Sequence, residues 1–204
     1  MGASAAPDGR MTTDEYLAWA EGRPGRYELI DGQVVAMSPE RVRHAEVKAA
    51  AYLALRSAIR SAGLPCRAMP DGMTVRIENH TAFEPDALVY CGERADPGAV
   101  EIANPVIVVE VVSPGTRSVD QGAKLRGYFR VASVAHYLIL YPDNRLVVHH
   151  ARGGGDVIAT RMVSEGTLSL DPPGLTLSVA SGLSLGKEVR ELAAWRSALA
   201  RLHS

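Results

Sequence analysis

The stretch Pro105–Val112, which reads PVIVVEVV, decides the fold class of this chain. Between Val106 and Val112 it holds five valines and one isoleucine around a single acid, Glu110. Valine and isoleucine favour strands, and a near-continuous apolar run is typical of a strand that is buried on both faces. The stretch therefore predicts a central strand of a sheet, with one carboxylate inside it.

Two carboxylates stand in predicted strands, where charges are rare. A charged residue seldom occupies a central strand unless it is paired, hydrogen-bonded or bound to a metal, because removing a lone carboxylate from water is costly. Glu110 is one such acid, and Asp86, directly after Pro85 in an expected strand at Phe83–Tyr90, is the other. If the two strands are neighbours, both carboxylates converge at one point.

Two convergent carboxylates repel each other unless they share a proton or a divalent cation. With no cysteine or histidine as a partner, ligation by oxygen alone indicates Mg²⁺ or Mn²⁺. The residues themselves leave a second interpretation open, in which Asp86 and Glu110 are surface strand residues or partners in ion pairs.

The residues after Glu110 predict a helix that runs from about residue 118 to residue 132. Its polar row consists of Asp120, Lys124 and Tyr128. Its packed stripe is expected to consist of Leu125, Phe129 and Ala132. Lys124 has the reach to lie over the acids and to orient a metal-bound water. The alternative is an Asp120–Lys124 surface ion pair.

The other elements are predicted from periodicity, capping and turn residues. Helices are expected at 12–22, 40–62 and 187–202, and the second of these has an apolar stripe of Ala45, Ala49, Tyr52, Leu55 and Ile59. Strands are expected at 66–69, 74–78, 156–163 and 175–179, and hairpins at 26–38 and 135–150. In this interpretation residues 1–10 form a loose tail, and residues 11–204 form a single α/β domain that ends in a helix.

Composition excludes several classes of protein. The chain has 204 residues, 47% of them apolar, and a formal net charge of -1, which excludes a histone-like polycation. No apolar run approaches the ~20 residues that cross a bilayer, and the N-terminal residues lack the pattern of a secretory signal. Cys66 and Cys91 predict neither a zinc site nor a disulfide, so a reducing cytoplasm is the expected location.

Several short motifs of this chain together resemble one known family. They are Glu84-Pro85-Asp86, Pro105–Pro114 with Thr116-Arg117, and the row Asp120, Lys124 and Tyr128, with Tyr27–Gly32, Met37–Pro39 and His44 upstream. In order and spacing they resemble the Uma-two family of bacterial endonucleases, which belongs to the PD-(D/E)xK superfamily. The resemblance covers about residues 11 to 180.

The resemblance implies a fold and a set of functional residues. The implied fold is a restriction-endonuclease-like core, an α/β structure in which helices flank a mixed β-sheet with added β-hairpins. The implied metal ligands are Asp86, Glu110 and Val111, the implied catalytic residues also include Lys124 and Glu28, and the supporting residues are Asp120 and Tyr128. The superfamily's lysine normally stands two residues after the acid, where this chain has Val112, so the resemblance assigns that role to Lys124.

Basic residues near the start of the helix at 40–62 are candidates for binding a phosphate backbone. The candidate nucleic-acid-binding residues are Arg41, Arg43, His44, Lys48, Arg117 and Arg126. A solvated helix start is the alternative for the first four, because a helix N-terminus does not favour cations.

These observations together predict an endonuclease that depends on Mg²⁺ or Mn²⁺ and hydrolyses DNA phosphodiester bonds. The resemblance implies in-line attack at phosphorus that leaves a 5′-phosphate and a 3′-hydroxyl. A homodimer is also expected, and no association with a membrane. The contrasting hypothesis is a catalytically inactive nuclease-fold module that binds nucleic acid or a protein partner.

Overall fold

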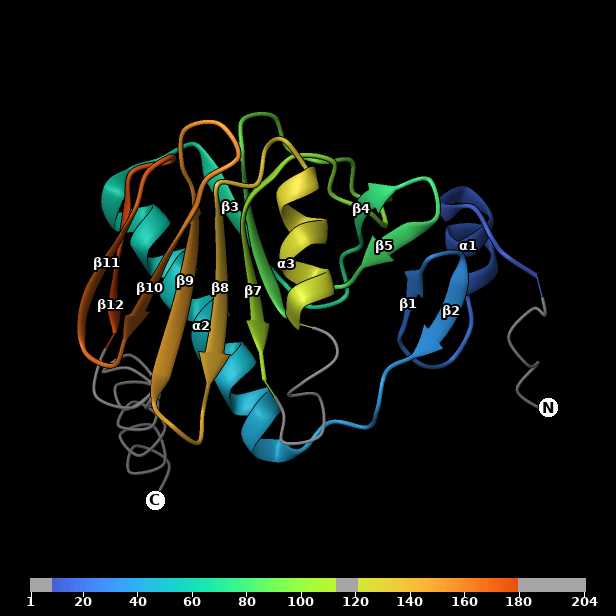
Figure 1. The fold of residues 1–204 in the computed structure, drawn as a ribbon, viewed down its shortest axis with the longest axis horizontal. Helices are drawn as coiled ribbons and strands as arrows, with labels where there is room; N and C mark the ends of the chain where they lie inside the picture. The colour runs from blue at the N-terminus through green and yellow to red at the C-terminus, as the bar shows by residue number, and fades with distance from the viewer. Residues whose placement is uncertain (1–8, 113–120, 180–204) are drawn as a thin grey trace, which may run out of the picture.

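The computed structural model describes residues 9–112 and 121–179 (Figure 1). Three sequence predictions lie wholly or partly outside the described residues: the tail at 1–10, the helix start with Arg117 and Asp120, and the helix at 187–202. Among the helices that the structure describes, none is long and apolar enough to cross a bilayer.

The predicted central strand, β7 (Pro105–Val111), lies inside a six-stranded mixed sheet. The strand order is β10 (Ile158–Val163), β9 (Leu146–Arg152), β8 (His136–Tyr141), β7, β6 (Ala87–Cys91) and β3 (Cys66–Pro70). Strand β7 runs parallel to β8 and antiparallel to β6. Ile107, Val108 and Val109 are at most 1% exposed, which confirms a strand that is buried on both faces.

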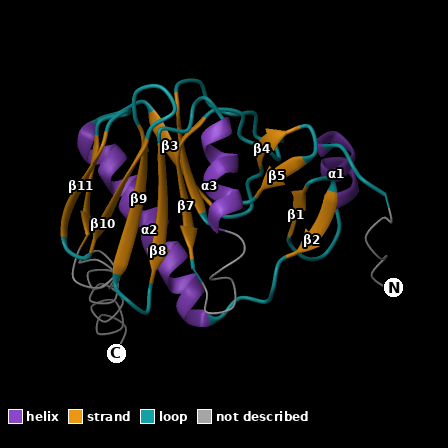
Figure 2. Ribbon diagram, in the orientation of Figure 1, coloured by secondary structure: helices purple, strands orange, loops and turns teal. Residues whose placement is uncertain are grey.

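Two helices cover opposite faces of this sheet (Figure 2). Ile107 and Val109 belong to the core beneath α2 (Val42–Ala62), whereas Val108 belongs to the core beneath α3 (Gln121–Arg130). Successive side chains of a strand point to opposite faces. Glu110 therefore lies on the α3 face, like Val108.

The buried stripe of α2 differs from the predicted one. Ala45 and Ala49 are exposed. The apolar residues that α2 buries are Val47, Ala51, Leu55 and Ile59. Alanine buries little apolar area, so the larger Val47 decides which side of the first turns faces the core.

A second sheet, of four strands, lies beside the first (Figure 1). Its order is β2 (Gln33–Ala36), β1 (Tyr27–Ile30), β5 (Thr81–Phe83) and β4 (Val75–Glu78). Asp31 and Gly32 join β1 to β2, and both have positive φ, as the two-residue turn of the predicted hairpin requires. Helix α1 (Thr13–Ala20) precedes this sheet and begins with a capping box.

The single strand predicted at 83–90 is wrong. The chain forms β5 in the small sheet, leaves it after Phe83, and enters the large sheet as β6. Pro85 lies at the crossing, where its lack of an N–H group and its fixed φ interrupt strand pairing. The crossing places Asp86 directly before the first residue of β6.

A third sheet, of two strands, follows β10 along the chain. It consists of β11 (Gly166–Leu170), which the sequence analysis does not predict, and β12 (Leu175–Val179). Leu168, Leu170 and Leu175 are buried in the core beneath α2. Strand β12 contacts α2, so this sheet adds to the core beneath that helix.

Cys66 and Cys91 form a disulfide, contrary to the sequence interpretation. Cys66 begins β3, Cys91 ends β6, and the antiparallel register sets them opposite each other. Their separation of 25 positions gives no sign of this, because only the strand register brings them together. The expectation of a reducing cytoplasm rests on unpaired thiols, so the disulfide removes its premise.

Candidate active site

Asp86 and Glu110 lie on neighbouring chain segments. Strands β6 and β7 pair with Ala87 opposite Val109, and the Asp86 N–H, just before β6, donates to the Val109 carbonyl at 2.9 Å. The Val111 N–H donates to Asp86 Oδ2 at 2.7 Å, which ties this acid to the end of β7. The segments that carry the two predicted acids are therefore neighbours.

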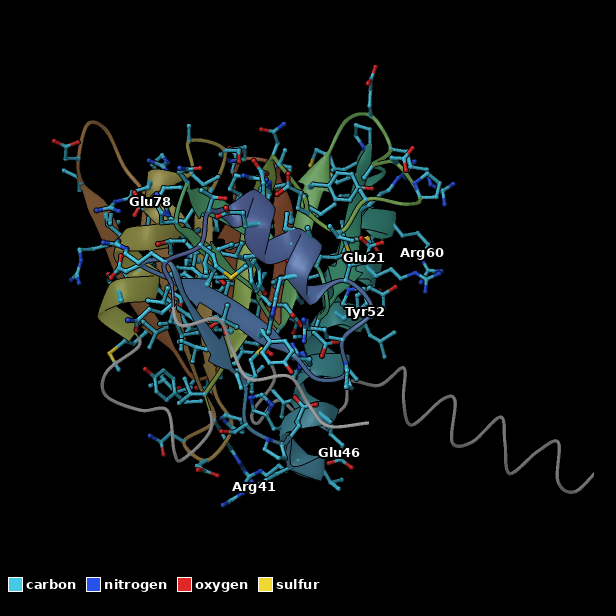
Figure 3. All side chains as sticks on the ribbon, turned by 90° about the vertical axis from the view of Figure 1, so that its right-hand side faces the viewer. Glu21, Arg41, Glu46, Tyr52, Arg60 and Glu78 are labelled. Carbon is cyan, nitrogen blue, oxygen red and sulfur yellow. A yellow bond between two sulfur atoms is a disulfide. The ribbon has the colours of Figure 1, made fainter. Side chains whose placement is uncertain are left out.

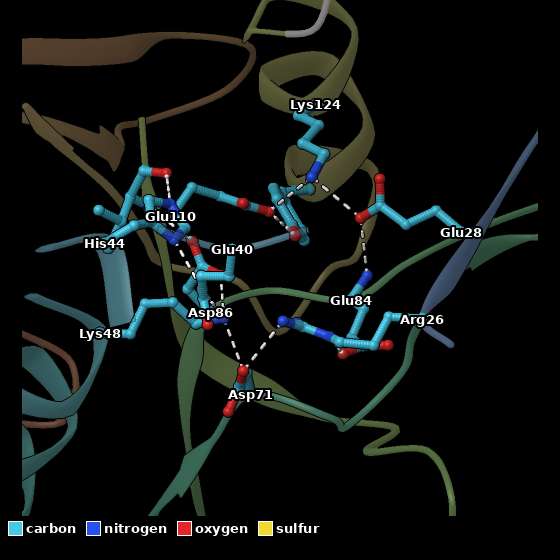
Figure 4. A network of polar contacts seen from close by, with 12 residues as sticks. Arg26, Glu28, Glu40, His44, Lys48, Asp71, Glu84, Asp86, Glu110 and Lys124 are labelled. Carbon is cyan, nitrogen blue, oxygen red and sulfur yellow. Dashed lines mark hydrogen bonds and ion pairs between the residues drawn. The ribbon is translucent and has the colours of Figure 1, made fainter. Parts of the chain in front are cut away.

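Lys124 of α3 lies between two acids that come from different sheets (Figure 4). Its Nζ donates to Glu110 Oε1 at 3.0 Å and to Glu28 Oε1 at 2.9 Å. The Tyr128 hydroxyl, one helical turn later, donates to the same oxygen of Glu110 at 2.6 Å. The structure thus brings Glu28, Glu110, Lys124 and Tyr128 together.

Lys124 and Tyr128 of the predicted polar row are more deeply buried than the predicted packed stripe of α3, of which Leu125 and Phe129 also pack against the core. Lys124 is 6% exposed and Tyr128 is fully buried. Leu125 and Phe129, the predicted packed stripe, are only partly buried, and Ala132 is exposed beyond the end of the helix. An ammonium is tolerated at such a buried position because carboxylates compensate its charge.

Glu110 is poorly compensated in its ionised form. Burial raises the pKa of Glu110 to about 8. The attraction of Lys124 opposes this shift, and the carboxylates of Asp86 and Glu28 add to it. Burial also raises the pKa of Tyr128 well above its usual value, so its hydroxyl stays protonated and donates to Glu110. Further positive charge would stabilise the Glu110 carboxylate.

Glu28 connects the small sheet to this site. It extends from β1, and its Oε1 also accepts the backbone N–H of Glu84 at 2.9 Å. The Glu84 carboxylate pairs with Arg26 at 2.6 Å, and Arg26 pairs with Asp71 at 3.0 Å. The crossing segment is thereby tied to β1, which helps to fix the position of Asp86.

A second buried lysine lies on the other side of Asp86. Lys48 of α2 is 5% exposed. Its Nζ forms three ion pairs, at 2.7, 2.6 and 3.1 Å, with Glu40, Asp71 and Asp86. Burial alone would lower the pKa of Lys48, but these carboxylates outweigh it and raise the pKa. The site therefore contains a second ammonium that stays charged.

The described residues of the predicted basic patch do not share one environment. Arg41, Arg43 and Arg126 are exposed, and Arg41 lies at the surface where α2 begins (Figure 3). Lys48 is instead buried among carboxylates, and His44 is directed towards Asp86 (Figure 4). Arg41, Arg43 and Arg126 are therefore the members of the predicted patch that the described structure exposes.

His44 corrects the expectation that the acids have no histidine partner. Its Nε2 lies 2.6 Å from the Val111 carbonyl oxygen and 3.9 Å from Asp86 Oδ2. Glu40, His44 and Asp86 each offer a ligand atom, and these atoms lie within 4.8 Å of one another. Glu40 and His44 stand four positions apart at a helix start, and this spacing is the signal that sequence reasoning overlooked.

Other members of the network have no local signal. They are Arg26, Asp71 and Glu84. Asp71 stands in an Asp-Gly turn, and Arg26 stands in a loop just before β1. Turn and loop positions are usually solvated, so only the folded chain shows that these side chains meet.

The donor set of this network fits a divalent cation. Its described carboxylates are Glu28, Glu40, Asp71, Glu84, Asp86 and Glu110, and its described permanent cations are Arg26, Lys48 and Lys124. Buried carboxylates in excess of cations are stabilised by a hard divalent ion. Asp86 pairs with Lys48, Glu110 pairs with Lys124 (Figure 4), and the Val111 carbonyl oxygen lies 2.6 Å from His44 Nε2.

Comparisons with known proteins agree with this fold. A protein of Synechocystis sp. described as uncharacterized is 27% identical over 187 residues, which cover 86% of this chain and 92% of that protein. A crystal structure of a "putative nuclease belonging to DUF820" from Anabaena variabilis matches with a TM-score of 0.67 at 16% identity. That match covers 86% of this chain and 98% of the solved one, and it shows a shared fold.

A family model matches most of the chain. It is the model of the Uma2 (Uma-two) family, described as "Putative restriction endonuclease", and it matches residues 13–183. That range includes Lys48, Lys124 and all three sheets of the described structure. The chain therefore belongs to the Uma-two family.

Proposed function

We propose that this protein is a divalent-metal-dependent endonuclease that hydrolyses DNA phosphodiester bonds. The observation that carries the proposal is the position of Lys124, which is bonded to Glu110 on the strand next to Asp86. Two acids on adjacent segments would hold a cation, and a buried ammonium paired with one of them can orient water there.

The metal would be held by Asp86, Glu110 and the carbonyl of Val111. Mg²⁺ and Mn²⁺ suit such oxygen donors. When bound, the cation would lower the pKa of a coordinated water and offset negative charge on the phosphate. Tyr128 restrains Glu110, and the Val111 N–H restrains Asp86, so both carboxylates are held in place before substrate arrives.

Lys124 would orient the attacking water and stabilise the charge that develops on the phosphate oxygens. Its ammonium is held by Glu28 of the four-stranded sheet. The position of Glu28 therefore does not depend on the strands that carry the metal ligands. Glu28 thus positions Lys124. In-line attack would form a bond between the water oxygen and phosphorus and break the P–O3′ bond. The attacking water would release a proton to solvent, and the 3′-oxygen would take one from solvent or a neighbouring acid, which leaves a 5′-phosphate and a 3′-hydroxyl.

DNA would bind through a local basic surface, because the whole chain has a formal net charge of -1. Arg41 and Arg43 at the start of α2 and Arg126 on α3 are exposed on the two helices that flank the site. The expected homodimer stays a prediction from the sequence.

The test is cleavage of supercoiled plasmid and of circular single-stranded DNA with Mg²⁺, with Mn²⁺ and with EDTA. We expect nicked or linear products with a metal and none with EDTA. Asp86→Asn protein, purified in the same way, controls for contaminating nucleases. If the parent cleaves neither DNA with either metal but still binds DNA, the inactive nuclease-fold module becomes the better account.

A further inference from the structure

The His44 ring is held at both nitrogens by groups of this site (Figure 4). Its Nδ1 lies 2.7 Å from Glu40 Oε1. Its Nε2 lies 2.6 Å from the Val111 carbonyl oxygen and 3.9 Å from Asp86 Oδ2. The ring therefore has a carboxylate behind it and faces two oxygens that belong to the proposed metal ligands.

This arrangement is typical of a histidine that binds a metal. A metal-ligating histidine usually gives the N–H of its other ring nitrogen to a carboxylate, which fixes the tautomer and the direction of the ligating nitrogen. Glu40 is placed to be that carboxylate, and Lys48 holds it through an ion pair at 2.7 Å. Lys48 also pairs with Asp86, so one ammonium fixes the spacing between the two acids.

We propose that His44 Nε2 is a ligand of the cation bound by Asp86 and the Val111 carbonyl, and that Glu40 is the residue that positions His44. This inference rests on the metal dependence in the proposed function. It changes the donor set from oxygen alone to oxygen with one imidazole nitrogen. His44 thereby leaves the predicted DNA-binding patch and joins the metal site.

The nitrogen ligand predicts which metal the site prefers. Mg²⁺ favours oxygen donors and gives up its water reluctantly, whereas imidazole suits first-row transition metals. Mn²⁺ accepts both carboxylate and imidazole ligands. We therefore expect Mn²⁺ to bind more tightly than Mg²⁺, and we expect His44 to be the source of the difference.

The experiment measures bound Mn²⁺ by electron spin-echo spectroscopy on the full chain without a histidine tag. We expect modulation from a directly coordinated ¹⁴N nucleus in the parent, and its replacement by a ¹⁵N signal in protein labelled with ¹⁵N-histidine. His44→Ala should lose this modulation and bind Mn²⁺ at least about tenfold more weakly, with a smaller change for Mg²⁺. His80→Ala, which changes a histidine of the small-sheet turn, is the matched control and should keep it.

The outcomes separate this inference from the proposed function. Bound Mn²⁺ without ¹⁴N modulation in the parent overturns the assignment of His44, whereas metal-dependent DNA cleavage would still support the nuclease. Modulation that survives in His44→Ala overturns it as well. If the parent binds no Mn²⁺, both the assignment and the metal dependence fail.

If His44→Ala does not fold, His44→Gln is measured instead, because an amide side chain offers oxygen and no imidazole nitrogen. For Glu40→Gln we expect weaker Mn²⁺ binding with the modulation retained, as a positioning role requires.

Discussion

Lys48 and Lys124 are two buried lysines of one site, yet their surroundings differ. They are 5% and 6% exposed, and each pairs with an acid predicted to hold the metal. Lys48 pairs with Asp86 and also with Glu40 and Asp71, three acids that surround it. Lys124 instead joins Glu110 of the large sheet to Glu28 of the small sheet.

The comparison teaches that burial beside a carboxylate does not identify a catalytic lysine. Lys48 neutralises acids that lie just before α2, in a turn and just before β6, so its first effect is on stability and on the placement of Asp86. Lys124 shares Glu110 with Tyr128 and lies on the helix that covers the α3 face of the sheet, where Glu110 lies. We therefore assign chemistry to Lys124 and architecture to Lys48.

The largest expected effect is the loss of both cleavage and metal-induced stabilisation in Asp86→Asn. The amide keeps an acceptor for the Val111 N–H but removes the charge that binds a cation. At a metal concentration about 100 times its dissociation constant, binding stabilises the parent by about 2.7 kcal/mol. Thermal unfolding with and without Mn²⁺ should show an increase in Tm for the parent and none for Asp86→Asn.

The control for this prediction is Glu78→Gln, which alters an exposed acid paired with Arg130. It should keep both cleavage and the Tm increase. An Asp86→Asn protein that Mn²⁺ stabilises as much as the parent would remove Asp86 from the metal site.

The next effect separates the two lysines by stability. Lys48→Met removes the ammonium that Glu40, Asp71 and Asp86 share, and breaking a buried ion pair such as Lys48–Asp86 costs about 3–5 kcal/mol. Urea unfolding at neutral pH measures the loss. Arg43→Met is the matched control, because Arg43 forms an exposed pair with Asp143 that contributes at most about 1 kcal/mol. Equal losses in the two variants would show that Lys48 has no architectural role.

The pH dependence of stability tests the environment of Glu110. The pKa of Glu110 is raised to about 8 in the folded protein, against an ordinary value of 4.5 for a glutamate. Between these values the folded chain holds a proton that the unfolded chain releases, so the free energy of unfolding falls as pH rises. One proton gives a slope of at most about 1.4 kcal/mol per pH unit.

Urea unfolding in EDTA at several pH values between 4.5 and 8 measures this slope. Glu110→Gln cannot titrate, so it should gain stability relative to the parent as pH rises through that range. A constant difference between the two proteins over the range would show that the carboxyl group is not perturbed by its neighbours.

The smallest expected effect concerns the exposed arginines. Arg41→Ala and Arg43→Ala should each weaken DNA binding for every sequence and reduce the slope of log K against log salt by about 1. Binding titrations at several salt concentrations provide the measurement. Arg60→Ala, at the other end of α2, should leave the slope unchanged. The predicted DNA surface would be wrong if Arg60→Ala had the larger effect.

Local patterns predict much of the fold, because β7, both hairpins and the long helix each have a periodicity or a turn signal of their own. Pro85 shows the limit, since the strand through it is divided between two sheets. The Cys66–Cys91 disulfide and β11 depend on strand register and on packing against α2. Neither feature leaves a sign in a short window of sequence.

The candidate site, like the fold, can be predicted only where a local pattern of residues gives a signal. Asp86 and Glu110 can be selected because acids are costly in buried strands, and Lys124 because it lies in the polar row of the helix that follows. The family resemblance adds Glu28. The sequence does not predict the roles of Glu40 and Asp71 or the inward direction of Lys48. In the sequence these residues resemble a solvated helix start and a turn, and only the folded chain brings them together. Contacts between residues far apart in sequence are what single-sequence reasoning cannot supply.

The most direct test of the central claim measures cleavage and Mn²⁺ occupancy in the same sample of Lys124→Met. Methionine keeps much of the side-chain volume and removes the ammonium. We expect Mn²⁺ to remain bound and the single-turnover rate of plasmid cleavage to fall by about 10²–10³-fold, while Arg130→Met on the same helix cleaves like the parent. Cleavage by Lys124→Met at the parent's rate, with the metal equally bound, would contradict the assignment of chemistry to Lys124.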